Sequence, residues 1–120
     1  MTGNDNAFDD RKKSQEAKYK MDEERQFKLR ARRNKLLGLW AAAQMGLSDA
    51  EAAEFAKEAV MIGLEAPNDE QFILRLCKRA GEIDESRLVE ELSRAEEQAE
   101  KQIAAEFPTA LDTDHEQVGG

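Results

Sequence analysis

The pattern of apolar and polar residues predicts four helices joined by short connections. From about Met21 to Met45, apolar residues recur at the 3.6-residue period of an α-helix, while lysines and arginines follow the other side. The apolar side becomes denser toward Trp40, so we expect the second half of this helix to dock and its first turns to project. Gly46 follows it, and glycine is suited to the left-handed position that ends a helix.

Each of the other three helices begins with a capping signal. Ser48 and Glu51 form a capping box, and Asn68 and Asp84 are suited to cap the two helices after it. A glycine or a proline follows each helix as a stop. The predicted helices span about 49–63, 69–80 and 85–106. Because short connections make neighbouring helices antiparallel, the pattern predicts an all-α, antiparallel four-helix bundle.

The first twenty residues contain little that could be buried, so they cannot offset the entropy lost on ordering. Acidic residues nevertheless stand four places before basic ones, which favours helix once a surface is available. We therefore expect a disordered or partly helical N-terminal arm. The predicted organisation is an arm over 1–20, a bundle over 21–107 and a polar tail over 108–120.

Charge is distributed unevenly along the chain and limits the choice of partners. Residues 1–35 carry eleven Lys/Arg and seven Asp/Glu, whereas residues 36–120 carry seven and nineteen, which gives net charges of +4 and −12. The total of −8 makes nucleic acid an unfavourable main partner, because neutralising phosphates dominates such binding. A chain with ends of opposite charge is expected to bind different surfaces at each end.

No arrangement of residues supports catalysis. His115 is the only histidine and lies in the polar tail, and Cys77 lies on an apolar helical face as a core thiol would. The glycines form no phosphate-binding loop. We expect a protein that is not an enzyme and has no metal or cofactor; weak adenine-nucleotide binding between helices remains open, although no motif supports it. The absence of a signal peptide and of a membrane span, with a single cysteine, predicts a cytoplasmic protein without membrane insertion.

Two features could bind a partner. The stretch 25–35 contains six Lys/Arg and no acid. It is either a solvated helix face or a contact for an acidic protein surface or nucleic acid. The candidate contacts on it are Arg25, Lys28, Arg32 and Lys35. The second feature is the arm, in which Phe8 could serve as an aromatic anchor on binding.

The segment FDDRKKSQEAKYKMDEERQFKLRARRNKLLGLWAA resembles the zeta-subunit family of inhibitors of alphaproteobacterial F-type ATP synthases. FDDR, EAK and F-x(4)-RRNKLLG-x-WAA occur in the family's order, and the apolar and capping pattern continues through 48–107. The resemblance implies a four-helix bundle with a mobile inhibitory N-terminus. That region would enter the interface of the alpha and beta subunits in the catalytic head, near the gamma subunit. There it would block rotation in the ATP-hydrolysis direction.

The resemblance also implies roles for individual residues. The inhibitory contact would involve residues of the arm, namely Phe8, Asp9, Asp10, Arg11, Glu16, Ala17, Lys18 and Tyr19. The block near residue 35 would have mainly structural roles, at Arg32, Arg33, Asn34, Leu36, Leu37, Gly38 and Trp40. The protein would lie in the cytoplasm, peripheral to the membrane-bound ATP synthase.

Overall fold

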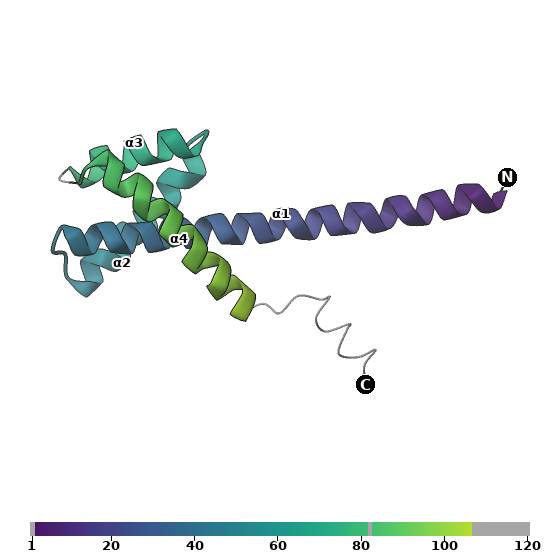
Figure 1. The fold of residues 1–120 in the computed structure, drawn as a ribbon, viewed down its shortest axis with the longest axis horizontal. Coiled ribbons are helices and arrows are strands. Elements are labelled where there is room, and N and C mark those ends of the chain that lie inside the picture. The colour runs from purple at the N-terminus through teal and green to yellow at the C-terminus, as the bar shows by residue number, and fades with distance from the viewer. Residues whose placement is uncertain (1, 82, 107–120) are drawn as a thin grey trace.

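The computed structural model describes the backbone of residues 2–81 and 83–106, and side chains from residue 22 onward within those ranges. The four helices are α1 (Thr2–Gln44), α2 (Asp49–Glu65), α3 (Asp69–Ala80) and α4 (Glu85–Glu106). Each helix turns back on the one before it, and α4 crosses α1 obliquely (Figure 1). The described part of the chain contains no strand, which confirms the predicted all-α bundle.

Helix α1 begins much earlier than the periodicity predicted. It was expected from about Met21, whereas the helical backbone begins at Thr2, so the predicted arm continues the same helix. This agrees with the helical tendency of the acid-before-base pairs in the first twenty residues. Figure 1 shows this part of α1 projecting beyond the other three helices.

The predicted N-terminal caps of α2 and α3 are present. The backbone N–H of Glu51 donates to Ser48 Oγ (3.3 Å), and the Ser48 N–H donates to the Glu51 carboxylate (3.0 Å), which completes the capping box. Asn68 Oδ1 accepts from the backbone N–H of Gln71 at 2.8 Å. These bonds satisfy N–H groups that lack partners within the helix, which explains why both helices begin where the sequence predicted.

The helix ends also follow local rules. Gly46 and Gly81 have φ angles of +72° and +81°, values that favour glycine, and they end α1 and α3 as predicted. Helix α2 runs to Glu65, two residues past its predicted end, because Gly63 adopts no positive φ and remains in the helix. Ala66 is extended, as expected for a residue before proline.

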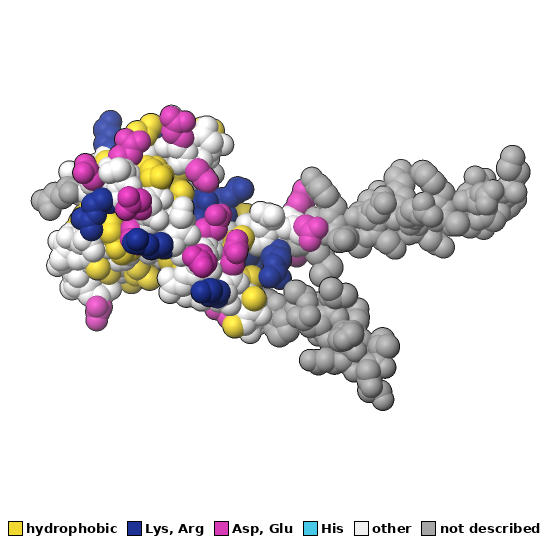
Figure 2. Space-filling model, in the orientation of Figure 1, with side chains coloured by type: hydrophobic (Ala, Val, Ile, Leu, Met, Phe, Trp, Pro, Cys, Tyr) yellow, Lys and Arg dark blue, Asp and Glu magenta, His cyan; other side chains and the backbone are white. Residues whose placement is uncertain are grey.

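The core lies where α1 packs against α2 and α4, and α3 packs against both α2 and α4 and contributes side chains to it. Small residues bring α1 and α2 unusually close together. A Cβ atom built on Gly38 would lie 2.8 Å from Ala59 Cβ and 2.9 Å from Ala56 Cα. The larger buried side chains are Leu37, Phe55, Phe72, Ile73, Leu76, Leu88 and Ile103. Acidic and basic side chains are interspersed on the described surface that faces the viewer in Figure 2.

Candidate functional site

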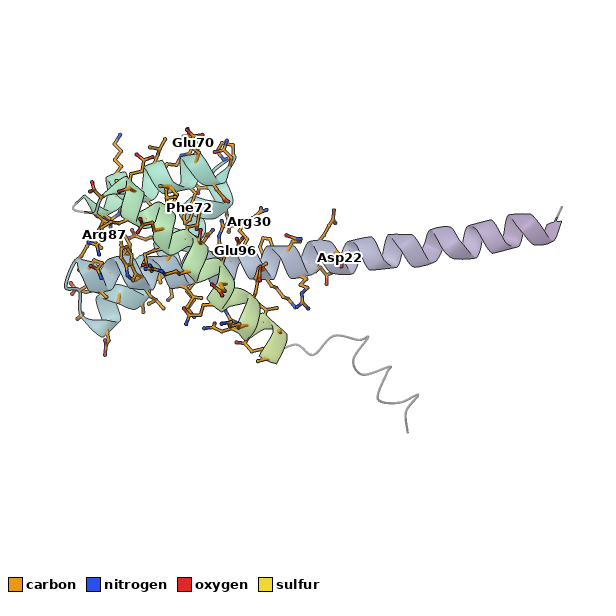
Figure 3. All side chains as sticks on the ribbon, viewed as in Figure 1. Asp22, Arg30, Glu70, Phe72, Arg87 and Glu96 are labelled. Atoms are coloured by element: carbon orange, nitrogen blue, oxygen red, sulfur yellow. The ribbon has the colours of Figure 1, made fainter. Side chains whose placement is uncertain are left out.

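The candidate site is the place where α1 leaves the bundle. Residues 22–28 are exposed, whereas Arg33, Asn34, Leu37 and Gly38 are buried. Figure 3 shows Asp22 on the projecting part of α1 and Arg30 where this helix reaches the bundle. The helix therefore emerges near residue 30, and the contacts there hold the base of the arm.

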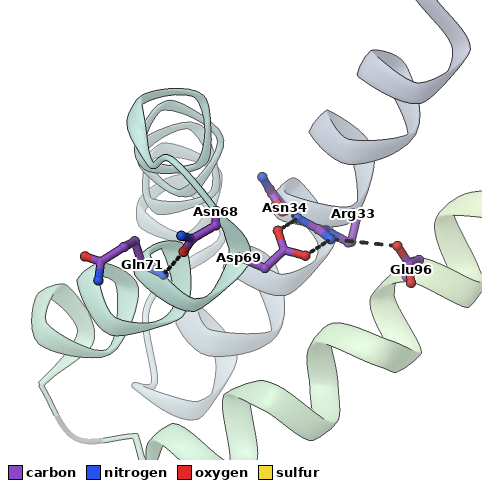
Figure 4. A network of polar contacts seen from close by, with 6 residues as sticks. All are labelled: Arg33, Asn34, Asn68, Asp69, Gln71 and Glu96. Carbon is purple, nitrogen blue, oxygen red and sulfur yellow. Dashed lines mark hydrogen bonds and ion pairs between the residues drawn. The ribbon is translucent and has the colours of Figure 1, made fainter. Parts of the chain in front are cut away.

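Arg33 joins three helices at this point. Its guanidinium donates to both carboxylate oxygens of Asp69 at the start of α3, at 2.8 and 3.0 Å. Its Nε donates to Asn34 Oδ1 at 3.0 Å, and Nη1 lies 3.7 Å from a Glu96 oxygen on α4 (Figure 4). Only 5% of Arg33 is exposed, so these contacts compensate for the removal of its charge from water. The Arg33 hydrogen bonds hold the pKa of Asp69 below its usual value.

Asn34 extends this network to α2. It is 2% exposed, and its side chain occupies the space over Gly63, where an added Cβ would lie 2.1 Å from Asn34 Nδ2. A glycine at position 63 is therefore what allows a buried amide to pack between α1 and α2. Since Asn34 accepts from Arg33, the amide and the guanidinium position each other.

Arg32 makes a separate contact with the end of α4. It donates to Glu106 through Nη1 (2.5 Å) and Nη2 (2.7 Å), and also through Nη1 to Gln102 Oε1 (2.8 Å). The hydrogen bonds from Arg32 lower the pKa of Glu106, and those to Glu106 raise the pKa of Arg32. Within the stretch 25–35, Arg32 and Arg33 thus bind carboxylates of other helices rather than lying on a solvated face.

A family model named ATPase inhibitor subunit zeta matches residues 5–102. The chain belongs to this zeta family. The match confirms the family that the sequence resembled, and it covers the predicted arm from residue 5, the base of the arm and most of α4. No curated protein and no solved structure gave a significant match. An ATPase inhibitor subunit is therefore the function that this family indicates.

The predicted contact residues of this zeta-family chain fall into two groups. The side chains of the predicted arm contacts, Phe8 to Tyr19, lie outside the described residues, as does His115 in the tail. Of the predicted second group, Arg25, Lys28 and Lys35 are exposed and Arg32 is bound to α4. The structure thus brings none of the predicted arm contacts into a described site, and their role stays a prediction.

Sequence reasoning did not find the partners of the two arginines. Asp69 directly follows the Asn68 cap, and an acidic residue is usual in the first turn of a helix. Its position in the sequence therefore indicated the start of a helix and gave no sign that it would bind an arginine. Phe27 continues the apolar side of α1 in the sequence pattern, yet it is 57% exposed because α1 has left the bundle by that residue. The available signal in the sequence was the polar pair Arg33 and Asn34 on the side of the helix that was expected to dock. A charged residue on that side requires a carboxylate on a neighbouring helix.

The described residues offer little for other chemistry. They contain no cluster of three or more His, Cys, Asp or Glu side chains that could hold a metal ion. Cys77 is half-buried and its Sγ donates to the carbonyl oxygen of Ile83 at 3.1 Å, as a packed structural thiol would. Among the described helices, none is long and apolar enough to cross a membrane.

Proposed function

We propose that this protein inhibits an F-type ATP synthase by inserting its N-terminal arm, residues 1–20, into the catalytic head. The arm enters the interface of the alpha and beta subunits near the gamma subunit and blocks rotation in the hydrolysis direction. The observation that carries the proposal is the match to the ATPase inhibitor subunit zeta family from residue 5, because it includes the arm. The protein then acts in the cytoplasm, at the periphery of the membrane-bound enzyme.

The shape of the chain supports this mechanism. Helix α1 extends from the bundle alone, and residues 2–30 span roughly 40 Å at 1.5 Å per helical residue. A single helix is about 10 Å wide, so it enters a cleft that the bundle cannot enter. The bundle limits the depth of insertion, and the contacts of Arg32 and Arg33 hold the inserted helix to it. In the arm, Phe8 is the anchor, and Asp9, Asp10 and Arg11 satisfy polar groups of the interface.

The test is ATP hydrolysis by a purified alphaproteobacterial ATP synthase head. The full-length chain and a chain lacking residues 1–19 are added in parallel, with Phe8→Ala in the full chain as a smaller change. The full chain should inhibit, the truncated chain should not, and Phe8→Ala should weaken inhibition about tenfold or more. The midpoint of thermal unfolding is the control, because the buried residues of the described chain begin at Arg33 and the truncated bundle should unfold at an unchanged temperature. Equal inhibition by the full and truncated chains would contradict the proposal.

The alternative partner for the basic stretch, nucleic acid, gains no support from these contacts. Arg32 and Arg33 would have to leave Glu106 and Asp69 before they could bind phosphates. The bundle also carries most of the acidic residues, which repel a polyanion. The basic stretch is therefore better suited to a protein contact than to nucleic acid.

A further inference from the structure

A groove lies at the base of the arm, between α1, α2 and α4. Its volume is about 340 Å³, which is enough to receive one or two large side chains. Its apolar lining consists of Phe27 and Ala31 of α1, Val60 of α2 and Ile103 of α4. Ile103 is only 3% exposed, whereas Phe27 is 57% exposed, more than any other large hydrophobic side chain on the described surface. The described residues therefore leave apolar surface uncovered in this groove, and most of it belongs to one aromatic ring.

Helix α4 ends at the edge of this groove. Ile103 lies in its last turn, and its final residue, Glu106, accepts two hydrogen bonds from Arg32, which also lines the groove. Figure 1 shows that α4 crosses α1 and ends on the side of the bundle from which the arm projects. The chain that follows Glu106 therefore begins beside the groove.

The sequence after Glu106 has its large apolar residues close to this starting point. Residues 107–120 read FPTALDTDHEQVGG, so Phe107 and Leu111 fall within the first five positions and the acidic residues begin at Asp112. Phe107 follows Ile103 by four residues, the spacing of neighbours on one side of a helix. Pro108 has no backbone N–H to continue the helix. The first five residues of the tail are thus suited to an apolar surface, and the remainder is suited to water.

The distance from the end of α4 to Phe27 is within reach of this segment. Phe27 precedes Arg32 by five residues, which is about 7.5 Å along the helix axis at 1.5 Å per residue. An extended chain spans roughly 3.3 Å per residue, so the five residues from Phe107 to Leu111 cover about 16 Å. A segment that begins at the partner of Arg32 can therefore lie along α1 as far as Phe27. Because its start is already held beside the groove, the entropy of closing the loop is small.

We propose that the groove is the docking site of the chain's own C-terminal segment, residues 107–111. Phe107 covers Ile103 and Leu111 packs on Phe27, so the apolar surface of the groove is removed from water. The contact joins the end of α4 to the part of α1 that has left the bundle. It supports the emerging helix for about one and a half turns beyond Arg32. The proposal concerns the free protein and does not rest on the proposed function.

The experiment measures hydrogen exchange of the backbone amides of residues 27–31, resolved by NMR, in full-length chains. Phe107→Ala combined with Leu111→Ala should increase these exchange rates about fivefold, because the emerging turns of α1 lose a packed partner and open more often. The same tail changes made in a Phe27→Ala chain should alter exchange less than 1.5-fold, roughly, since the surface on which they act is already absent. In the wild type, nuclear Overhauser contacts should join the Phe27 ring to the Leu111 methyl groups.

Two matched controls separate this contact from general effects. Val118→Ala removes an apolar tail residue outside the docking segment and should leave exchange unchanged. Leu74→Ala removes an exposed apolar side chain of α3 that does not line the groove, so the tail changes should keep their full effect in that chain. An unchanged exchange rate in the Phe107 and Leu111 variant overturns the proposal. An increase that persists in the Phe27→Ala chain locates the tail elsewhere and also overturns it.

The remaining outcomes identify other occupants of the groove. Contacts between Phe27 and Leu111 that appear only between isotope-labelled and unlabelled copies identify a second copy as the occupant, and they overturn the proposal. If the tail changes leave exchange unchanged while Phe27→Ala weakens inhibition of ATP hydrolysis and Leu74→Ala does not, the groove binds the enzyme and the proposal is likewise overturned. The exchange measurements contain no ATP synthase, so the groove proposal and the proposed function can fail separately.

Discussion

Replacing Arg33 with alanine tests whether the buried network at the base of the arm stabilises the bundle. The change removes two hydrogen bonds to Asp69 and leaves the buried Asn34 oxygen without its donor. Asp69 and Glu96 have side chains that are 58% and 52% exposed, so their carboxylates regain water and add little penalty. The lost bonds are worth about 1 kcal/mol each in net terms, and the unpaired amide oxygen costs about 1–2 kcal/mol. The expected loss in the free energy of unfolding is therefore about 3 kcal/mol.

Arg32→Ala is the matched control because the two arginines are adjacent and each binds a carboxylate on another helix. The Arg32 and Glu106 side chains are 26% and 45% exposed, and a pair of this kind contributes about 0.5–1 kcal/mol. Thermal unfolding followed by circular dichroism should show a midpoint about 15 °C lower for Arg33→Ala and about 4 °C lower for Arg32→Ala. Equal shifts would refute the reasoning, because burial would then make no difference to the value of the contact.

Three further predictions concern packing and pH. Gly38→Val forces a side chain against the α2 backbone, so it should destabilise the bundle by about 2–3 kcal/mol in urea unfolding, and an unchanged midpoint would exclude close helix contact. Gly63→Ala should displace the Asn34 amide and lose about 1–3 kcal/mol; in a double-mutant cycle, its cost should shrink once the guanidinium is absent. The pKa values of Asp69 and Glu106 are held below 3.8 and 4.5, so their contribution is complete above these values and is lost as pH falls through the lowered ones. As pH falls below these ordinary values, the wild type should therefore lose more stability than a variant lacking both arginines, and parallel curves would contradict this.

Features that depend on a few neighbouring residues were predictable from the sequence. The capping boundary at Ser48 and the glycine ends at Gly46 and Gly81 follow from backbone groups within one helical turn, so no tertiary contact was needed to place them. The early start of α1 was less predictable, because an acid-base pattern favours a helix without fixing where its backbone begins. The functional role of the arm was inferred from the resemblance to the family and not from the chemistry of its residues.

The base of the arm could not be predicted because its contacts are distant in sequence. Arg33 and Asp69 are 36 residues apart, and Arg32 and Glu106 are 74 apart. An amphipathic pattern predicts which residues share a side of a helix. The length of that side that becomes buried depends on where the neighbouring helices lie. Phe27 shows this limit: it continues the apolar side of α1, yet α2 and α4 leave more than half of it exposed.

Two kinds of contact fix α1 in the bundle: one sets its distance from α2, and the other sets its rotation about its own axis. Close packing at Gly38 sets the distance between α1 and α2, but a row of small apolar residues resists rotation weakly. The paired bonds from Arg33 to Asp69 set the rotation of α1 about its axis, because a planar guanidinium binds a carboxylate in one orientation. Phe27 lies six residues before Arg33, which turns its direction by about 240° from the guanidinium and away from α3. The same network that stabilises the bundle therefore also determines which side of the emerging helix carries the exposed Phe27.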